Sequence, residues 1–182
     1  MSWMIEILKK YMSVDCPVAI FTNRNDYDRF AVGIIIAVTA EYILVKNINS
    51  RGEFDGYSVT NTSMIYRLES DSKYLRKIKK LYDCKKGDDV FNICLNGNLL
   101  MNILQYAIDN NVISKICIDE DANDIVGYID QLKGEIVKIN QISDYGEIDG
   151  ETVFRIDEIL KIAIADSDII DLDLLFRFKE GK

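Results

Sequence analysis

Two stretches of sequence decide the fold: AVGIIIAVTAEYILVKNINSRGEFDGYSVTNTSMIYRL at residues 31–68 and IVGYIDQLKGEIVKINQISDYGEIDGETVFRIDEILKI at residues 125–162. They align without a gap at an offset of 94 residues. Gly33 meets Gly127, and Gly52-Glu53-x-Asp55-Gly56 meets Gly146-Glu147-x-Asp149-Gly150. Because glycines, acids and apolar positions agree together, we predict that the chain is a tandem duplication.

An apolar helix is predicted ahead of each repeat. In the first copy, apolar residues recur at the i, i+1, i+4 spacing of one helix face, which predicts a helix over residues 3–13. The same stripe returns at an offset of 96 residues and predicts a helix over 98–110. The matched positions are Trp3, Met4, Ile7, Leu8, Tyr11 and Met12 in the first copy and Leu99, Leu100, Ile103, Leu104, Ala107 and Ile108 in the second.

Five strands are expected after each of these helices, in runs rich in isoleucine, valine and tyrosine. They are placed at 17–22, 31–40, 42–49, 56–61 and 64–69, and again at 115–119, 125–132, 135–142, 150–155 and 158–164. The Asp-Gly pairs are expected to form a hairpin turn between the third and fourth strands. A closing helix follows in each copy, capped by Asp71-Ser72 or by Asp166-Ser167.

The expected domains are a first repeat over 1–86, a polar linker over 87–97 and a second repeat over 98–182. Five short antiparallel strands in about 65 residues are too few for a sandwich of two large sheets. Closing the bent sheet into a small barrel would remove its exposed edges. The predicted fold class is therefore mainly β with flanking helices, as two tandem small five-stranded barrels, each preceded and followed by a helix.

The order of elements in each repeat resembles the Sm-like (LSm) superfamily of small β-barrels. The resemblance rests on the leading helix, the early glycine of the second strand (Gly33 and Gly127), the turn after the third strand and the paired isoleucines of the short last strands. A generic SH3-like barrel is the alternative. The resemblance implies a non-catalytic protein that assembles through its strand edges and binds RNA.

Sm-like proteins contact RNA through two loop motifs, and the corresponding loops differ here. The first holds Thr39-Ala40-Glu41-Tyr42 in copy one and Lys133-Gly134-Glu135-Ile136 in copy two. The second holds Asn61-Thr62-Ser63 and Arg155-Ile156-Asp157. Tyr42 as a stacking ring and Arg155 as a cation are the residues that the resemblance marks for RNA.

Charge is distributed unevenly along the chain, which has a formal net charge of −8. Residues 1–91 carry a net charge of +2, and residues 92–182 carry −10. Since nucleic-acid-binding proteins usually present a basic face, the overall charge favours a protein partner over RNA.

The closing helix of copy one is basic, whereas its duplicate is acidic. The cations are Lys73, Arg76, Lys77, Lys79, Lys80, Lys85 and Lys86, and the acids are Asp166, Asp168, Asp171 and Asp173. Three interpretations stay open: two solvated helix faces, attraction between the two helices within or between chains, or an acidic partner or RNA on the basic helix. Lys73, Arg76, Lys77 and Lys80 are the candidate partner-binding residues.

The sequence contains no histidine, which excludes Ser-His-Asp and Cys-His catalysis and histidine-based zinc sites. The duplicated acids are weak metal candidates, because two carboxylates per hairpin are too few for a calcium site. They are Glu53, Asp55, Glu147 and Asp149. No motif indicates a cofactor.

Four cysteines without a visible secretion signal predict a reduced, cytoplasmic protein, and no stretch is apolar enough to span a membrane.

Three functions follow from these observations. The first is a non-catalytic adaptor that binds a protein partner, or itself, through strand edges or charged helices. The alternative is an RNA-binding ring of the Sm-like kind. A distant third is a carboxylate or metal-dependent enzyme that uses the duplicated acids.

Overall fold

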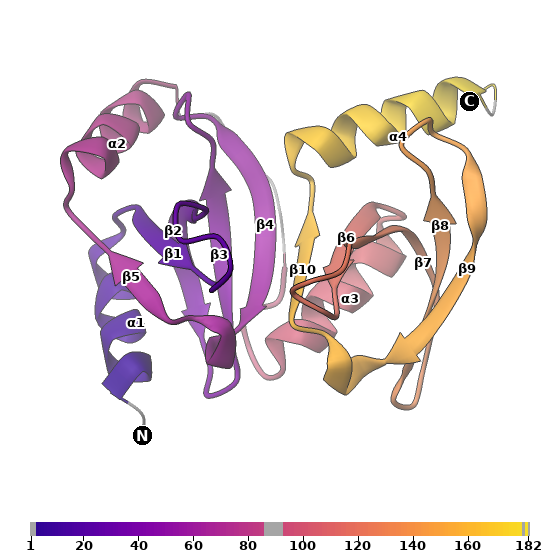
Figure 1. The fold of residues 1–182 in the computed structure, drawn as a ribbon, viewed down its shortest axis with the longest axis horizontal. Coiled ribbons are helices and arrows are strands. Elements are labelled where there is room, and N and C mark those ends of the chain that lie inside the picture. The colour runs from indigo at the N-terminus through magenta and orange to yellow at the C-terminus, as the bar shows by residue number, and fades with distance from the viewer. Residues whose placement is uncertain (1–2, 86–92, 180, 182) are drawn as a thin grey trace. The chain divides into compact units, whose positions relative to one another are not determined.

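A computed structural model describes residues 3–85, 93–179 and 181 (Figure 1). The predicted linker over 87–97 and Lys86 fall wholly or partly outside these residues, since 86–92 are not described. The chain divides into two compact units, Met1–Leu99 and Leu100–Lys182. Within the described residues, no helix is both long and apolar enough to cross a membrane.

The first unit contains the predicted helices and strands in the predicted order. They are α1 (Trp3–Val14), β1 (Val18–Phe21), β2 (Ala31–Val38), β3 (Tyr42–Ile48), β4 (Phe54–Asn61), a 3-10 turn η1 (Thr62–Met64), β5 (Arg67–Glu69) and α2 (Lys73–Lys85).

The second unit repeats this order. Its elements are α3 (Leu99–Asp109), β6 (Ile113–Cys117), β7 (Ile125–Lys133), β8 (Ile136–Ile142), β9 (Ile148–Arg155), η2 (Ile156–Glu158), β10 (Lys161–Ile164) and α4 (Ser167–Lys179). Fine details repeat as well. The β2–β3 ladder shifts register between Ile35 and Ala37, and the β7–β8 ladder shifts between Ile129 and Gln131, 94 residues later.

The prediction of two closed five-stranded barrels is wrong. Within the first unit the strand order is β5-β1-β2-β3-β4, and within the second it is β10-β6-β7-β8-β9. All of these ladders are antiparallel, and no ladder among the described residues joins β4 to β5 or β9 to β10. The sheet is therefore open, and only the coarser prediction of a mainly β protein with flanking helices is confirmed.

Two helices cover the two faces of the first sheet, which removes the need for closure. Side chains of β1 point alternately to opposite faces. Val18 and Ile20 lie in one apolar cluster with Leu8 of α1. Ala19 and Phe21 lie in another with Leu75, Ile78 and Tyr82 of α2. All four residues of β1 are buried, because each face has its own helix.

The predicted hairpin turn lies slightly earlier than expected. Gly52 and Gly146 adopt positive φ angles of 74° and 69°, and their amides donate to Asn49 and Ser143 at 2.9 Å. The Asp-Gly pairs instead form a β-bulge, in which Asp55-Gly56 stands opposite the single residue Asn47. Glycine thus permits both the turn and the bulge.

The closing helices are capped by equivalent positions of the two copies. The Ser72 hydroxyl accepts the Leu75 amide at 3.2 Å, and the Asp166 carboxylate accepts the Ile169 amide at 2.8 Å. Ser72 and Asp166 are 94 residues apart, the offset of the sheet. The caps were predicted from the correct dipeptides, but Ser72 corresponds to Asp166 rather than to Ser167.

Candidate functional site

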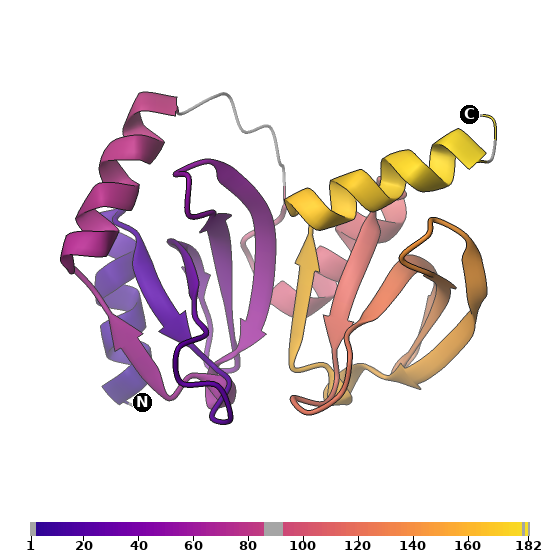
Figure 2. The same ribbon diagram turned by 45° about the horizontal axis from the view of Figure 1, so that its top comes forward.

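The pairing of β1 with β5 brings the end of α1 beside the start of α2. Ala19 pairs with Glu69 in this antiparallel ladder, so the beginning of β1 lies opposite the end of β5. Since α1 ends just before β1 and α2 starts just after β5, the two helix ends meet at one corner of the first unit (Figure 2). This corner holds a mainly apolar hollow.

A groove of about 450 Å³ occupies this corner, and we call it the cationic groove. Its apolar lining consists of Tyr11, Val14, Pro17, Val18 and Leu75. Its cationic lining consists of Lys10, Arg76, Lys79 and Lys80, with Cys16, Ser70 and Asp71 completing the wall. An apolar floor bordered by positive charge is suited to an apolar side chain carried on an acidic segment.

The four cations of the groove differ in their local partners. Arg76 pairs with Asp71 at 3.0 Å, and Lys79 pairs with Asp83 at 2.6 Å. The hydrogen bond to Asp83 raises the pKa of Lys79, which keeps its ammonium charged. Lys10 and Lys80 have no carboxylate partner among the described residues. These two lysines are therefore the charges available to a partner.

The same corner of the second unit lacks the cationic groove. Two pairs of matched contacts fix the equivalence of α2 and α4. A Cβ on Gly52 would contact Leu81, and a Cβ on Gly146 would contact Leu175. The ion pair between Glu53 and Lys85 corresponds to the ion pair between Glu147 and Lys179. At this offset of 94 residues, Arg76, Lys79 and Lys80 correspond to Ile170, Asp173 and Leu174, and Lys10 corresponds to Tyr106 at the helix offset of 96. The groove is thus particular to the first unit.

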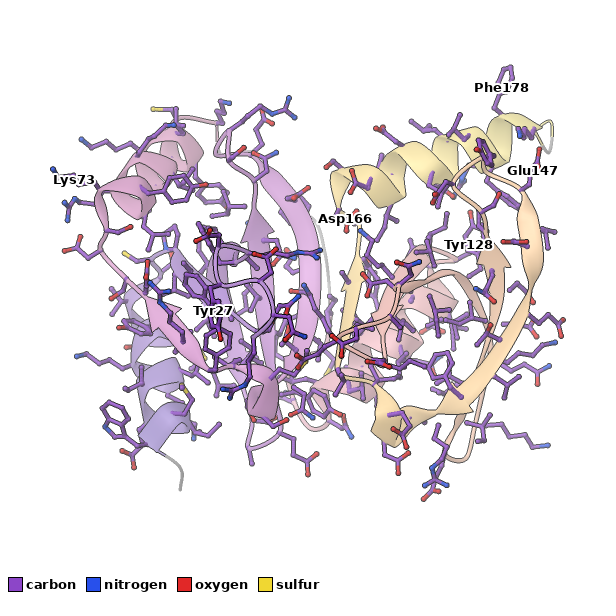
Figure 3. All side chains as sticks on the ribbon, viewed as in Figure 1. Tyr27, Lys73, Tyr128, Glu147, Asp166 and Phe178 are labelled. Carbon is purple, nitrogen blue, oxygen red and sulfur yellow. The ribbon has the colours of Figure 1, made fainter. Side chains whose placement is uncertain are left out.

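Two of the four predicted partner-binding cations line the groove. Arg76 and Lys80 are on its wall, whereas Lys73 and Lys77 are exposed on α2 outside it. Figure 3 shows Lys73 pointing outward from the helix. The four predicted cations thus fall on two different faces of α2, and two of them line the candidate groove.

The two residues marked by the RNA resemblance, Tyr42 and Arg155, lie in different units and have different surroundings. Tyr42 lies in β3 and is only 8% exposed, so little of its ring is accessible for stacking. Arg155, at the end of β9, pairs with Glu135 at 3.2 Å and with Asp157 at 2.9 Å. The hydrogen bond to Asp157 raises the pKa of Arg155. Tyr42 is not among the residues that line the cationic groove of its own unit.

The sequence missed the contribution of α1 to the site. Lys10, Tyr11 and Val14 line the groove, although Tyr11 was interpreted as a member of the apolar helix stripe. The signal that could have located them is the β1–β5 pairing, which joins segments about 50 residues apart. Sequence periodicity reports the buried face of one helix and carries no information on which two helix ends meet.

The duplicated acids tie the hairpins to the closing helices. Glu53 pairs with Arg51 at 2.9 Å and Lys85 at 3.1 Å, and Glu147 pairs with Lys179 at 2.6 Å. A hydrogen bond from Asn49, followed by that from Lys85, lowers the pKa of Glu53. Asp55 and Asp149 lie in the bulges of β4 and β9. In the described part of the chain, no three His, Cys, Asp or Glu residues cluster in a way that could hold a metal ion.

Comparisons with known proteins identify no relative. No protein-family model, no curated protein and no solved structure matches the chain. The resemblance to Sm-like proteins therefore stays a prediction, and the function must be argued from the surfaces of the two units.

Proposed function

We propose that the protein is a non-catalytic adaptor whose cationic groove binds an acidic, amphipathic segment of a protein partner. The observation that supports this proposal is the combination of an apolar lining with two lysines that have no carboxylate partner within residues 3–85 and 93–179. Val14 is 54% exposed at this corner, and Leu75 lies beneath it. Surface cations on an ordinary solvated helix have no need of an apolar hollow beside them.

The apolar and cationic lining of the groove suits an amphipathic helical segment as the bound form. Amphipathic helices bind by inserting apolar side chains at i and i+4 into such hollows, while their charged flanks meet the rim. Acidic flanks would lie beside Lys10 and Lys80. RNA gains less from this site, because Arg76 and Lys79 are already paired with carboxylates and the aromatic ring in the described lining, Tyr11, is only partly exposed.

A direct binding experiment tests the proposal. The probe is a fluorescent helical peptide of about 13 residues, with leucine at three positions spaced by four and glutamate between them. The full chain is titrated against this peptide, against its lysine counterpart and against a single-stranded RNA oligonucleotide. We expect saturable binding of the acidic peptide and none of the basic one.

Two variants of α2 give a matched comparison. Lys80→Glu reverses a charge on the groove, and Lys77→Glu reverses the same charge on the same helix outside it. We expect Lys80→Glu to weaken peptide binding about tenfold and Lys77→Glu to change it less than about twofold. Equal effects of the two variants, or binding of the RNA in preference to the acidic peptide, would overturn the proposal.

A further inference from the structure

The outward face of α4 is apolar, although its inward face already packs on the second sheet. Ile169 is buried, and Leu172 and Phe176 pack against the same cluster, where the Phe176 ring lies 5.4 Å from that of Tyr128. The outward residues are 47% to 84% exposed, and we call them the apolar stripe: Ile170, Leu174, Leu175 and Phe178. Figure 3 shows Phe178 pointing away from the unit. A second apolar stripe on a helix whose inward face is already packed is typical of a helix with a further partner.

The equivalent helix of the first unit shows that the fold does not require this stripe. The α2 residues equivalent to Ile170, Leu174 and Phe178 are Arg76, Lys80 and Cys84. The inward positions Leu75, Ile78 and Tyr82 are apolar in α2 as well, and they are buried. The fourth stripe residue, Leu175, corresponds to Leu81, and each lies beside the hairpin glycine of its own unit. The apolar character of Ile170, Leu174 and Phe178 is therefore the part of the stripe that the packing of the unit does not require.

The charges beside the apolar stripe are negative once internal ion pairs are considered. Arg177 pairs with Asp173 at 2.6 Å, and Lys179 pairs with Glu147. Asp171 borders the stripe and is exposed, whereas Asp168 lies 3.9 Å from the Lys115 ammonium. The stripe therefore presents apolar side chains at i, i+4 and i+8 with Asp171 as its acidic neighbour.

We infer that the apolar stripe of one chain docks in the cationic groove of a second copy of this chain. The inference rests on the proposed function of the groove, and it names an occupant with the required chemistry. Apolar side chains of α4 would meet the apolar floor at Val14 and Leu75, and Asp171 would meet the rim at Lys80. Complementary charges on two different faces of one chain favour this pairing over stripe against stripe, where acidic flanks would face each other.

Such a contact is head to tail, because the two surfaces are not the same patch. An open assembly keeps one groove and one stripe unoccupied, at its two ends, unless a ring closes. Self-association also fills the groove, so a second copy and an external acidic partner compete for it. Binding of an external partner in the groove would therefore displace the apolar stripe of the second copy and dissociate the assembly.

Complementation between two variants tests the inference. The stripe variant is Leu174→Glu with Phe178→Glu, and the groove variant is Arg76→Glu with Lys80→Glu. The mass of each full chain is followed by light scattering from about 10 µM to about 1 mM, the range of weak interfaces. We expect the wild-type mass to rise with concentration and each variant alone to stay monomeric. An equimolar mixture should form a 1:1 heterodimer, because it contains one intact stripe and one intact groove.

Control variants and the peptide probe separate the possible failures. Tyr27→Ser removes another exposed aromatic ring, 68% accessible in the first unit, and should leave the assembly unchanged. A wild-type chain that is monomeric throughout, or a mixture that forms no heterodimer, overturns the inference. A groove variant that associates like the wild type indicates stripe-to-stripe contact and also overturns it.

Binding of the acidic peptide to the stripe variant tells whether the proposed function survives. If this variant binds the peptide while no variant mixture associates, only the inference fails. If it neither binds the peptide nor associates, both fail. A monomeric wild type whose affinity for the peptide rises at least about tenfold on Leu174→Glu indicates occupation of the groove by its own chain, which excludes the second copy.

Discussion

Ser114 offers a test in which removing a hydroxyl stabilises the protein. Its side chain lies in β6, is 0% exposed, and its oxygen has no hydrogen-bond partner among the described residues. The equivalent position of the first unit is Val18, since Ser114 pairs with Gly127 as Val18 pairs with Gly33. The fold therefore accepts an apolar side chain at this point of the sheet.

The expected change in the free energy of unfolding follows from the cost of burying an unsatisfied hydroxyl, which is about 1–3 kcal/mol. Ser114→Ala recovers most of this cost and leaves a hole of one atom, so we expect a net stabilisation of about 1 kcal/mol. In a unit of this size, that change raises the melting temperature by about 4–8 °C. Chemical denaturation should show a higher midpoint with an unchanged slope.

Ser58 provides the matched control of opposite sign. It is also buried in a strand, but its hydroxyl donates to the Asn47 side chain at 3.1 Å. Ser58→Ala leaves that amide without its donor and should destabilise the protein by about 1 kcal/mol. If Ser114→Ala destabilises as much as Ser58→Ala, then the Ser114 hydroxyl is satisfied and the reasoning is refuted.

Three further predictions concern the turns and helix ends. Gly127→Ala should destabilise by about 2 kcal/mol in urea denaturation, because a Cβ there would lie 2.1 Å from the Asn140 carbonyl oxygen. Asp166→Ala should cost about 1 kcal/mol of stability through loss of the α4 cap, while Asp166→Asn keeps most of it; thermal unfolding of both variants checks this. Because folding lowers the pKa of Glu53 below its usual 4.5, its contribution to stability is present above that pH and is lost as the pH falls below it. The difference in urea midpoint between wild type and Glu53→Gln should therefore shrink from about pH 7 to about pH 3, and a constant difference would contradict the role of the Lys85 ion pair.

The elements of the fold were predictable because each is encoded locally. The strand predicted at 31–40 is β2 (Ala31–Val38), and the helix predicted at 98–110 is α3 (Leu99–Asp109). Their apolar periodicity and the intervening glycines depend on neighbours in sequence. Closure into a barrel is different, because it depends on whether the short last strand pairs with β1 alone or with β4 as well. Periodicity within β5, only three residues long, does not decide this.

The site was predictable only in part for the same reason. Charge along α2 identified Arg76 and Lys80, since a run of cations is visible in sequence. The groove also requires Tyr11 and Val14 of α1, which join it through the long-range β1–β5 ladder. The charge of a helix can be read from one segment of sequence, whereas the groove forms only when two segments distant in sequence pack together.

The duplication separates the residues that the fold needs from those available for function. Positions that face the sheet keep their character in both copies: Leu75 corresponds to Ile169, and Tyr82 to Phe176. Positions that face outward diverge, since Arg76 and Lys80 of α2 correspond to the apolar Ile170 and Leu174 of α4, and Lys77 corresponds to Asp171. Relaxed surface positions would drift among polar residues, because exposed apolar stripes promote non-specific association. An apolar stripe with acidic neighbours in one copy and an apolar groove with basic neighbours in the other are each costly alone, and each is explained if the other covers it.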